Sequence, residues 1–121
     1  MASLPMTVVD LPDGEQLLDI TGAARRLGLS AGKIRTMVAE HELLAVNVEG
    51  QPMIPEVFFD DDGIAKHLTG LIAVLYDGGF DRDGVMRWLF TVHDDLGEYP
   101  ARALHGHSAR EMIRRAQALG F

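Results

Sequence analysis

Hydrophobic residues along much of the chain recur at intervals of three and four. In the stretch 31–40 they are Ile34, Met37 and Val38. Residues at this spacing share one face of an α-helix, so the pattern predicts an amphipathic helix with that face buried. Ser30 directly precedes the stretch, and a serine in this position accepts a hydrogen bond from the first amides of a helix. We therefore expect Ser30 to be the N-cap.

A shorter helix is predicted immediately before, over Thr21–Leu27, with Thr21 as its N-cap. Gly28 follows this helix, and glycine readily adopts the positive φ that a tight turn requires. Ala24 is small and lies where the two helices would cross. Two helices joined by so short a turn form a helix-turn-helix.

The period changes between Leu44 and Ile54, where apolar and polar residues alternate. Gly50 lies at the bend of this stretch. Alternation on both sides of a glycine is typical of a β-hairpin, and a hairpin after a helix-turn-helix is the wing of a winged helix.

The part of the chain after Pro55 is predicted to be wholly helical. Apolar residues continue at helical spacing over 64–75, and Asp81 is expected to cap the helix that follows. The last helix should bury Leu119, and Trp88 should belong to the core.

These elements predict a mainly α protein with a small β-hairpin wing: a winged helix-turn-helix followed by a helical C-terminal subdomain. The predicted organisation is a flexible N-terminal tail over 1–16, the winged helix-turn-helix over 17–59, and the helical subdomain over 60–121, packed on it. The tail contains two prolines and few large apolar residues, which favours mobility.

Composition narrows the class of protein. The chain has 121 residues, of which 47% are hydrophobic, enough for one compact domain with its own core. The absence of cysteine excludes disulfides, thiolate zinc sites and a cysteine nucleophile. The sequence begins without the features of a signal peptide, and the longest apolar stretch, 68–76, is too short to span a bilayer. We therefore expect a cytoplasmic protein without a membrane partner.

Charge is distributed unevenly. The net charge of −7 argues against non-specific attraction to nucleic acid. The segment Thr21–Val38 nevertheless contains Arg25, Arg26, Lys33 and Arg35 and no acidic residue. A local basic face can bind phosphates while acidic residues elsewhere limit non-specific binding.

Residues 28–32 also match G-x-S-x-G, the nucleophile elbow of α/β-hydrolases. That motif needs a buried strand before its serine, whereas the residues before Ser30 favour a helix and include two arginines. The chain is also too short for the hydrolase sheet. We therefore expect no catalytic activity.

Metal binding has little support in the sequence. His93, His105 and His107 have no specific ligand spacing. The Asp81–Gly84 segment imitates part of a calcium-binding loop, but the closing glutamate position falls on Phe90. We expect neither a metal site nor a cofactor.

The residues so far carry a family resemblance. The stretch Ile20–Val38, followed by the hairpin and Ile54-Pro55, resembles the winged helix-turn-helix of MerR-like and excisionase-like proteins. From about Val9 to Phe121, the chain more closely resembles a small actinobacterial family of winged-helix DNA-binding proteins associated with receptor-like Ser/Thr kinases. The second half also resembles the C-terminal domain of Xre/ParS-type antitoxins through Trp88-Leu89, Leu96-Gly97, Pro100 and Leu104.

The resemblance implies a DNA-binding protein, a transcriptional or nucleoid-associated regulator. The helix from Ala31 would enter the major groove. Lys33 and Arg35 would donate to guanine or phosphate, while Arg25 and Arg26 would reach the flanking backbone. The full set of candidate DNA-contacting residues is Arg25, Arg26, Ser30, Lys33, Arg35, Thr36, Asn47 and Gln51.

The resemblance also implies a Ser/Thr protein kinase as a partner, and Thr7 in the predicted tail is a candidate acceptor. A phosphate adds about −1.5 to −2 charges to a segment that already contains Asp10, Asp13 and Glu15. Phosphorylation at Thr7 is therefore predicted to lower DNA affinity.

The alternative is a protein-interaction or antitoxin-like adaptor with a degenerate helix-turn-helix. Its helical half would bind a protein partner or form a homodimer. The net acidity and Glu49 in the hairpin favour this hypothesis, whereas the unbroken basic segment favours DNA binding. A steep loss of duplex affinity with salt would distinguish the two, since only DNA binding releases condensed counterions.

Overall fold

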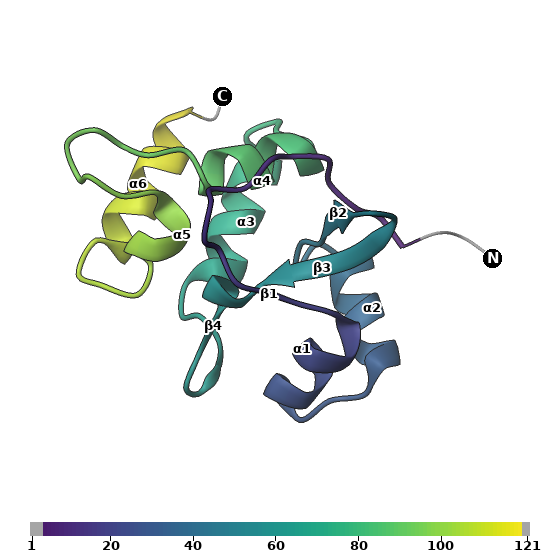
Figure 1. Ribbon diagram of the computed structural model, residues 1–121. Coiled ribbons are helices and arrows are strands. Elements are labelled where there is room, and N and C mark those ends of the chain that lie inside the picture. The colour runs from purple at the N-terminus through teal and green to yellow at the C-terminus, as the bar shows by residue number, and fades with distance from the viewer. Residues whose placement is uncertain (1–3, 120–121) are drawn as a thin grey trace.

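The computed structural model describes residues 4–119. In this part of the chain, a winged helix-turn-helix is followed by a helical region (Figure 1), which confirms the predicted fold class. The helices are α1 (Ile20–Leu27), α2 (Ala31–Ala39), α3 (Leu68–Asp77), α4 (Arg82–Leu89), α5 (Pro100–Ala103) and α6 (Ala109–Leu119). The strands are β1 (Leu17–Leu18), β2 (Val46–Val48), β3 (Gln51–Pro55), β4 (Phe59–Asp60) and β5 (Gly63–Ile64).

The first helix begins earlier than predicted. Asp19 is its N-cap, and its Oδ1 accepts a hydrogen bond from the Gly22 amide at 2.7 Å. The prediction that Thr21 caps this helix is therefore wrong, because the carboxylate two residues earlier already accepts from the free amide. The turn is as predicted, with Gly28 in the left-handed region at φ 68°.

The second helix follows the sequence pattern. Ser30 Oγ accepts a hydrogen bond from the Lys33 amide at 3.0 Å, so Ser30 is the N-cap. Ile34, Met37 and Val38 are buried against the core. Because α1 is a helix, the strand that a nucleophile elbow needs before its serine is not there.

The predicted wing is present as the β2–β3 hairpin. The three-stranded antiparallel sheet has the order β1-β3-β2, with Val48 paired to Gln51 at the end of the hairpin. Glu49 and Gly50 form its turn with φ of 53° and 82°. Two successive positive φ values give the turn a twist that matches the twist of the flanking strands.

Residues 4–16 do not form the mobile tail predicted over residues 1–16, and residues 1–3 lie outside the described part. Thr7 is fully buried and pairs with Val46 in a parallel bridge at the free edge of β2. The Thr7 amide donates to Ala45 O at 2.8 Å, and the Asn47 amide donates to Thr7 O at 2.9 Å. An exposed strand edge leaves backbone groups unpaired, and this segment pairs them.

The beginning of the second half also differs from the prediction. It contains the β4–β5 hairpin, in which Ile64 pairs with Phe59 and not with a helical neighbour. Asp60 holds the turn, since its Oδ1 accepts from the Asp62 amide at 2.8 Å and its Oδ2 from the Lys66 amide at 3.3 Å. Such local side-chain bonds compete with helix formation, and α3 begins only at Leu68.

One continuous hydrophobic core runs through both halves, from Ile20 on α1 to Ala116 on α6. Phe58, in the turn of 3₁₀ helix between β3 and β4, is fully buried, and its ring lies 5.8 Å from that of Phe90. Polar contacts add to this packing. Arg82 Nη2 donates to Ala39 O at 3.1 Å.

Two residues expected in the core are less buried than predicted. Leu119 is 46% exposed at the end of α6, and Trp88 is only half-buried. Asp81 caps α4 as predicted, with its Oδ1 accepting from the Gly84 amide at 2.8 Å.

Within residues 4–119, none of the helices combines the length and apolar character needed to cross a bilayer. The same described residues contain no group of three or more histidine and acidic side chains placed to hold a metal ion.

The caps lead to a prediction about stability. Ser30→Ala and Asp19→Ala should each lower the free energy of unfolding by about 1 kcal/mol, because each change leaves a helix amide without its acceptor. Thr21→Ala is the matched control and should change it by only a few tenths. Urea unfolding followed by circular dichroism measures all three. A larger loss for Thr21→Ala than for Asp19→Ala would contradict the assignment of the cap.

Candidate nucleic-acid interface

The outer surface of α1 and α2 is basic. Arg25, Arg26, Lys33 and Arg35 are all exposed. The acid-free segment predicted from the sequence thus forms an exposed cationic face on the helix-turn-helix. Within it, Arg26 is turned towards Glu56 and lines a hollow that Arg102 of α5 also lines. In Figure 1, α1 and α2 lie on the side of the molecule away from α6.

The three candidate side chains of α2 occupy different parts of its exposed face. With 3.6 residues per turn, Thr36 projects nearly opposite the buried stripe, while Lys33 and Arg35 flank it on either side. Thr36 Oγ1 donates to Gly32 O at 3.1 Å, so its lone pairs remain available to accept. The arrangement gives α2 a small, polar centre between two long cations.

Gly32 lies on the same face, one turn before Thr36. A Cβ at Gly32 would meet only Ser30 Oγ, at 3.9 Å. Crowding inside the protein therefore does not explain the glycine. With Gly32 and Thr36 at its centre, the face allows a ligand to approach the α2 backbone closely while the cations reach around it.

The two arginines of α1 are not equivalent. Arg26 Nη1 lies 3.5 Å from Glu56 Oε1, and the guanidinium lies over the Phe59 ring at 5.9 Å from its centroid. Arg25 makes no ion pair with any residue in the described part of the chain. Arg25 is therefore the freer of the two for a phosphate, while Arg26 would have to leave Glu56.

The wing does not bring its two candidates together. Side chains alternate between the faces of a hairpin, so the register places Asn47 with Pro52 on one face and Gln51 with Val48 on the other. Asn47 Oδ1 also accepts from the Gly50 amide at 2.7 Å, which commits half of the side-chain amide to the turn.

The two hairpins next to the helix-turn-helix carry exposed acidic side chains. Glu49 is exposed at the wing tip, and Asp61 and Asp62 are exposed in the turn between β4 and β5. That hairpin lies beside α1, since a Cβ added at Gly63 would lie 3.6 Å from Leu27 Cδ2. These acidic groups favour a ligand that matches the basic face alone and repel phosphates placed beyond it.

Arg82 is a positioning residue that the sequence did not single out. It lies on α4, yet it donates to the last carbonyl of α2, Ala39 O. A cation at this end of a helix also interacts favourably with the helix dipole. The pair is 43 residues apart in sequence, and no local pattern could have indicated it.

Comparisons with known proteins cover both halves of the chain. Residues 3–59 match a family model described as "DNA-binding protein Rv2175c, wHTH domain", and residues 65–120 match "Rv2175c C-terminal domain of unknown function". The chain is similar to "DNA-binding protein Rv2175c" of Mycobacterium tuberculosis, with 36% identity over an alignment of 134 residues covering 100% of this chain and 92% of the relative.

A solved structure supports the same relationship. The NMR structure of Rv2175c is similar to this fold with a TM-score of 0.85 and 35% identity, covering 99% of this chain and 91% of the other. The predicted resemblance to small actinobacterial winged-helix proteins is confirmed by these matches.

Proposed function

This chain belongs to the Rv2175c family of small winged helix-turn-helix DNA-binding proteins, and we propose that it binds double-stranded DNA with α2 in the major groove. The observation that carries the proposal is the acid-free cationic face of α1 and α2. We propose further that it acts as a transcriptional or nucleoid-associated regulator without a catalytic step.

Each side chain has a distinct role in the proposed complex. Lys33 and Arg35 straddle the centre of α2 and donate to guanine edges or phosphates. Thr36 contacts bases at the centre, where Gly32 permits close approach. Arg25 holds the flanking phosphates, and Ser30 fixes the helix start that points these groups at the groove.

The number of cations limits the strength of binding. Each neutralised phosphate contributes a slope of about −0.9 to the dependence of log affinity on log salt, so four cations give at most roughly −3.6. We therefore expect modest affinity with a clear salt dependence.

One prediction of the proposed complex concerns Arg35. Arg35→Ala should weaken the preferred duplex by about 1–3 kcal/mol if Arg35 contacts a guanine, whereas Lys33→Ala should weaken all sequences similarly and flatten the salt slope. The measurement is fluorescence anisotropy with duplexes selected from random sequence, at several salt concentrations. Arg110→Ala is the matched control, because Arg110 is exposed on α6 and should leave the affinity unchanged.

The same titration tests the proposed function itself. If the wild-type chain binds no duplex even at low salt, DNA binding is wrong and the protein is an adaptor that works through protein contacts. Equal losses for Arg110→Ala and Arg35→Ala would mean that general charge, and not the face of α2, governs the affinity.

Another prediction concerns the acidic wing tip. Glu49→Lys removes one repulsive charge and adds one attractive charge. Because exposed charge interactions are each worth on the order of 0–1 kcal/mol, the substitution should raise duplex affinity roughly three- to tenfold at low salt. Lysine and glutamate tolerate the turn's positive φ about equally, so stability should stay the same. Glu98→Lys, on the helical half, is the control. An unchanged affinity for Glu49→Lys would show that the wing tip lies away from the phosphates.

We also propose that a Ser/Thr kinase regulates the protein through Thr7. In the folded state Thr7 is buried, and its Oγ1 donates to Ala45 O at 3.2 Å. A phosphate of about −1.5 to −2 charges cannot be accommodated there without losing the pairing to β2. Phosphorylation would therefore act by releasing the segment and loosening the wing, and the kinase would modify Thr7 only while the segment is detached.

The substitutions Thr7→Glu and Thr7→Val separate charge from packing. Thr7→Glu should lower both the free energy of unfolding and the duplex affinity, since it places a charge at the buried position of the Thr7 side chain. Thr7→Val keeps the shape and the backbone pairing, and should lose only about 1 kcal/mol of stability with DNA binding intact. The idea fails if Thr7→Glu binds duplex as tightly as the wild type, or if a kinase that modifies the chain leaves Thr7 unmodified.

A further inference from the structure

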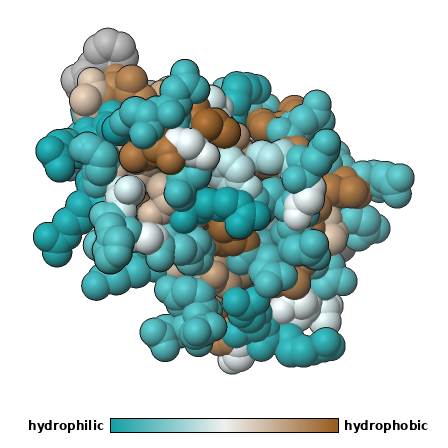
Figure 2. All heavy atoms as spheres, turned by 60° about the vertical axis from the view of Figure 1, so that its left-hand side comes forward, coloured by the Kyte–Doolittle hydropathy of each residue, from teal (hydrophilic) through white to brown (hydrophobic). Residues whose placement is uncertain are grey.

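An apolar groove lies at the C-terminal end of α4, outside the proposed DNA-binding face. Its volume is about 410 Å³, and Phe80, Trp88 and Val92 form its apolar part. A second hollow of about 280 Å³ continues from Phe80 to Leu119. Val92 is 51% exposed and Leu119 46% exposed. Apolar side chains reach the surface near the C-terminal end of α6, at the top left of Figure 2.

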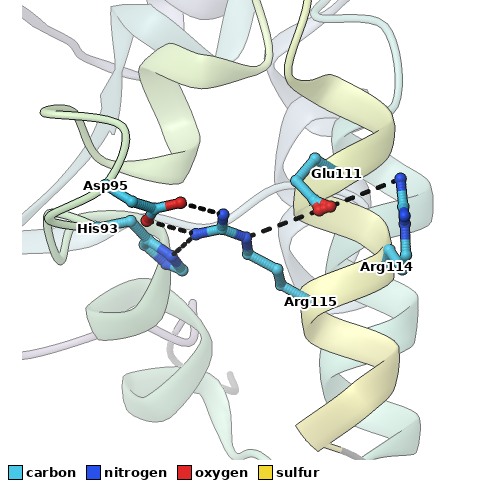
Figure 3. A network of polar contacts seen from close by, with 5 residues as sticks. All are labelled: His93, Asp95, Glu111, Arg114 and Arg115. Atoms are coloured by element: carbon cyan, nitrogen blue, oxygen red, sulfur yellow. Dashed lines mark hydrogen bonds and ion pairs between the residues drawn. The ribbon is translucent and has the colours of Figure 1, made fainter.

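The loop that forms one wall of the groove is held in place. Arg115 on α6 reaches across to it and makes a two-pronged hydrogen bond to the Asp95 carboxylate, with Nη1 at 2.9 Å from Oδ1 (Figure 3). The same Nη1 lies 2.9 Å from His93 Nδ1. Because arginine only donates, Nδ1 of His93 is the acceptor.

These contacts determine which charges remain at the groove. The hydrogen bonds from Arg115 hold the pKa of the Asp95 carboxyl below its ordinary value, so this ion pair persists to a lower pH than an unpaired carboxyl would allow. Two other charged residues line the groove, Arg87 and Asp94. Both are exposed, and neither makes an ion pair with any residue between 4 and 119.

One cation and one anion beside a single apolar strip make the surface self-complementary. In a two-fold contact the same patch meets itself, so residue i of one copy meets residue j of the other and the reverse. Such a contact forms two ion pairs, each between Arg87 of one copy and Asp94 of the other, and it removes Trp88 and Val92 from water. A partner of a single charge sign would leave one of the two charges without a counterpart.

We propose that a second copy of the chain occupies this groove about a two-fold axis, with Arg87 of each copy against Asp94 of the other. The loop after α4 that forms one wall of the groove lies on the α6 side of the molecule, whereas α1 and α2 lie on the other side (Figure 1). The pair would therefore present its two helix-turn-helix units outward, and it would bridge two duplexes. The association does not depend on DNA binding, whereas the bridging rests on the proposed function.

Charge reversal tests the contact on the full chain without DNA. Sedimentation velocity over a range of concentrations should show a weak monomer–dimer equilibrium for the wild type. Arg87→Glu and Asp94→Arg should each lower the association constant by about tenfold or more, because each change creates two like-charge contacts. The double variant should restore the association. Arg110→Glu is the control and should leave it unchanged.

A mixture of the two single variants gives a sharper result. In a two-fold pair that contains one copy of each variant, the carboxylate introduced by R87E faces the guanidinium introduced by D94R. The second contact of that pair joins the unchanged Asp94 of one copy to the unchanged Arg87 of the other. The 1:1 mixture of R87E and D94R should therefore dimerise as well as the wild type, although each variant alone does not. A heterologous contact elsewhere on the surface would not be rescued in this way.

Trp88 supplies an independent signal, since it is the only tryptophan in the chain. Its emission should shift to shorter wavelength as the protein concentration rises, and Val92→Ser should suppress that shift without introducing a charge. A wild type that remains monomeric at millimolar concentration overturns the proposal. So does a dimer that R87E and D94R leave intact, or one that the mixture and the double variant do not restore.

Failure of the DNA-binding proposal is distinguishable from failure of this one. If the chain dimerises and the R87E and D94R variants behave as expected, but no duplex is bound, the proposed dimer contact stands and the bridging of two duplexes is wrong. If the chain binds duplex but remains a monomer at every concentration, the DNA-binding proposal stands and the dimer contact is wrong.

Discussion

A hydrophobic core shared by both halves is the constraint on which the structure depends. A domain of about 60 residues buries only about 60% of its surface on folding and is marginally stable alone, and each half here is of that size. The core runs without a break from Ile20 to Ala116, with Phe58 at the junction. The helix that we propose to enter DNA is therefore held by the helical half and not by its own turn alone.

The end of α2 is held by two helices of the C-terminal half, α3 and α4. The Arg82 guanidinium donates to Ala39 O, and the His41 ring stacks on Tyr76 at 4.1 Å between centroids. On the other side of α4, the Val8 amide donates to Asp83 Oδ1 at 3.1 Å. Displacement of α4 would thus disturb both the helix-turn-helix and the N-terminal segment, because the first turn of α4 forms a hydrogen bond with each of them.

Local patterns predicted the parts of the fold that local chemistry determines. Helical periodicity gave the buried face of α2, the serine before it gave the cap, and Gly50 gave the hairpin. The pairing of Thr7 with β2 could not be predicted from the local pattern. The β-branched run Thr7-Val8-Val9 favours a strand, but it is short, and the residue that Thr7 bonds to lies 38 positions away. The partial burial of Trp88 and the exposure of Leu119 could not be predicted for a related reason, since periodicity locates an apolar face without showing how much of it the fold covers.

The candidate site divides in the same way. Its cations were predictable, because an acid-free run of 18 residues stands out in a chain with a net charge of −7. Which of these cations are free to bind a ligand could not be predicted, because the ion pair between Arg26 and Glu56 joins two residues that only the folded sheet brings together. Acidic residues at the wing tip and in the β4–β5 turn then narrow the usable surface to α2 and the free end of α1. Specific binding must come from shape and hydrogen bonding on this narrow face, because a net charge of −7 gives the whole molecule no general attraction for a polyanion.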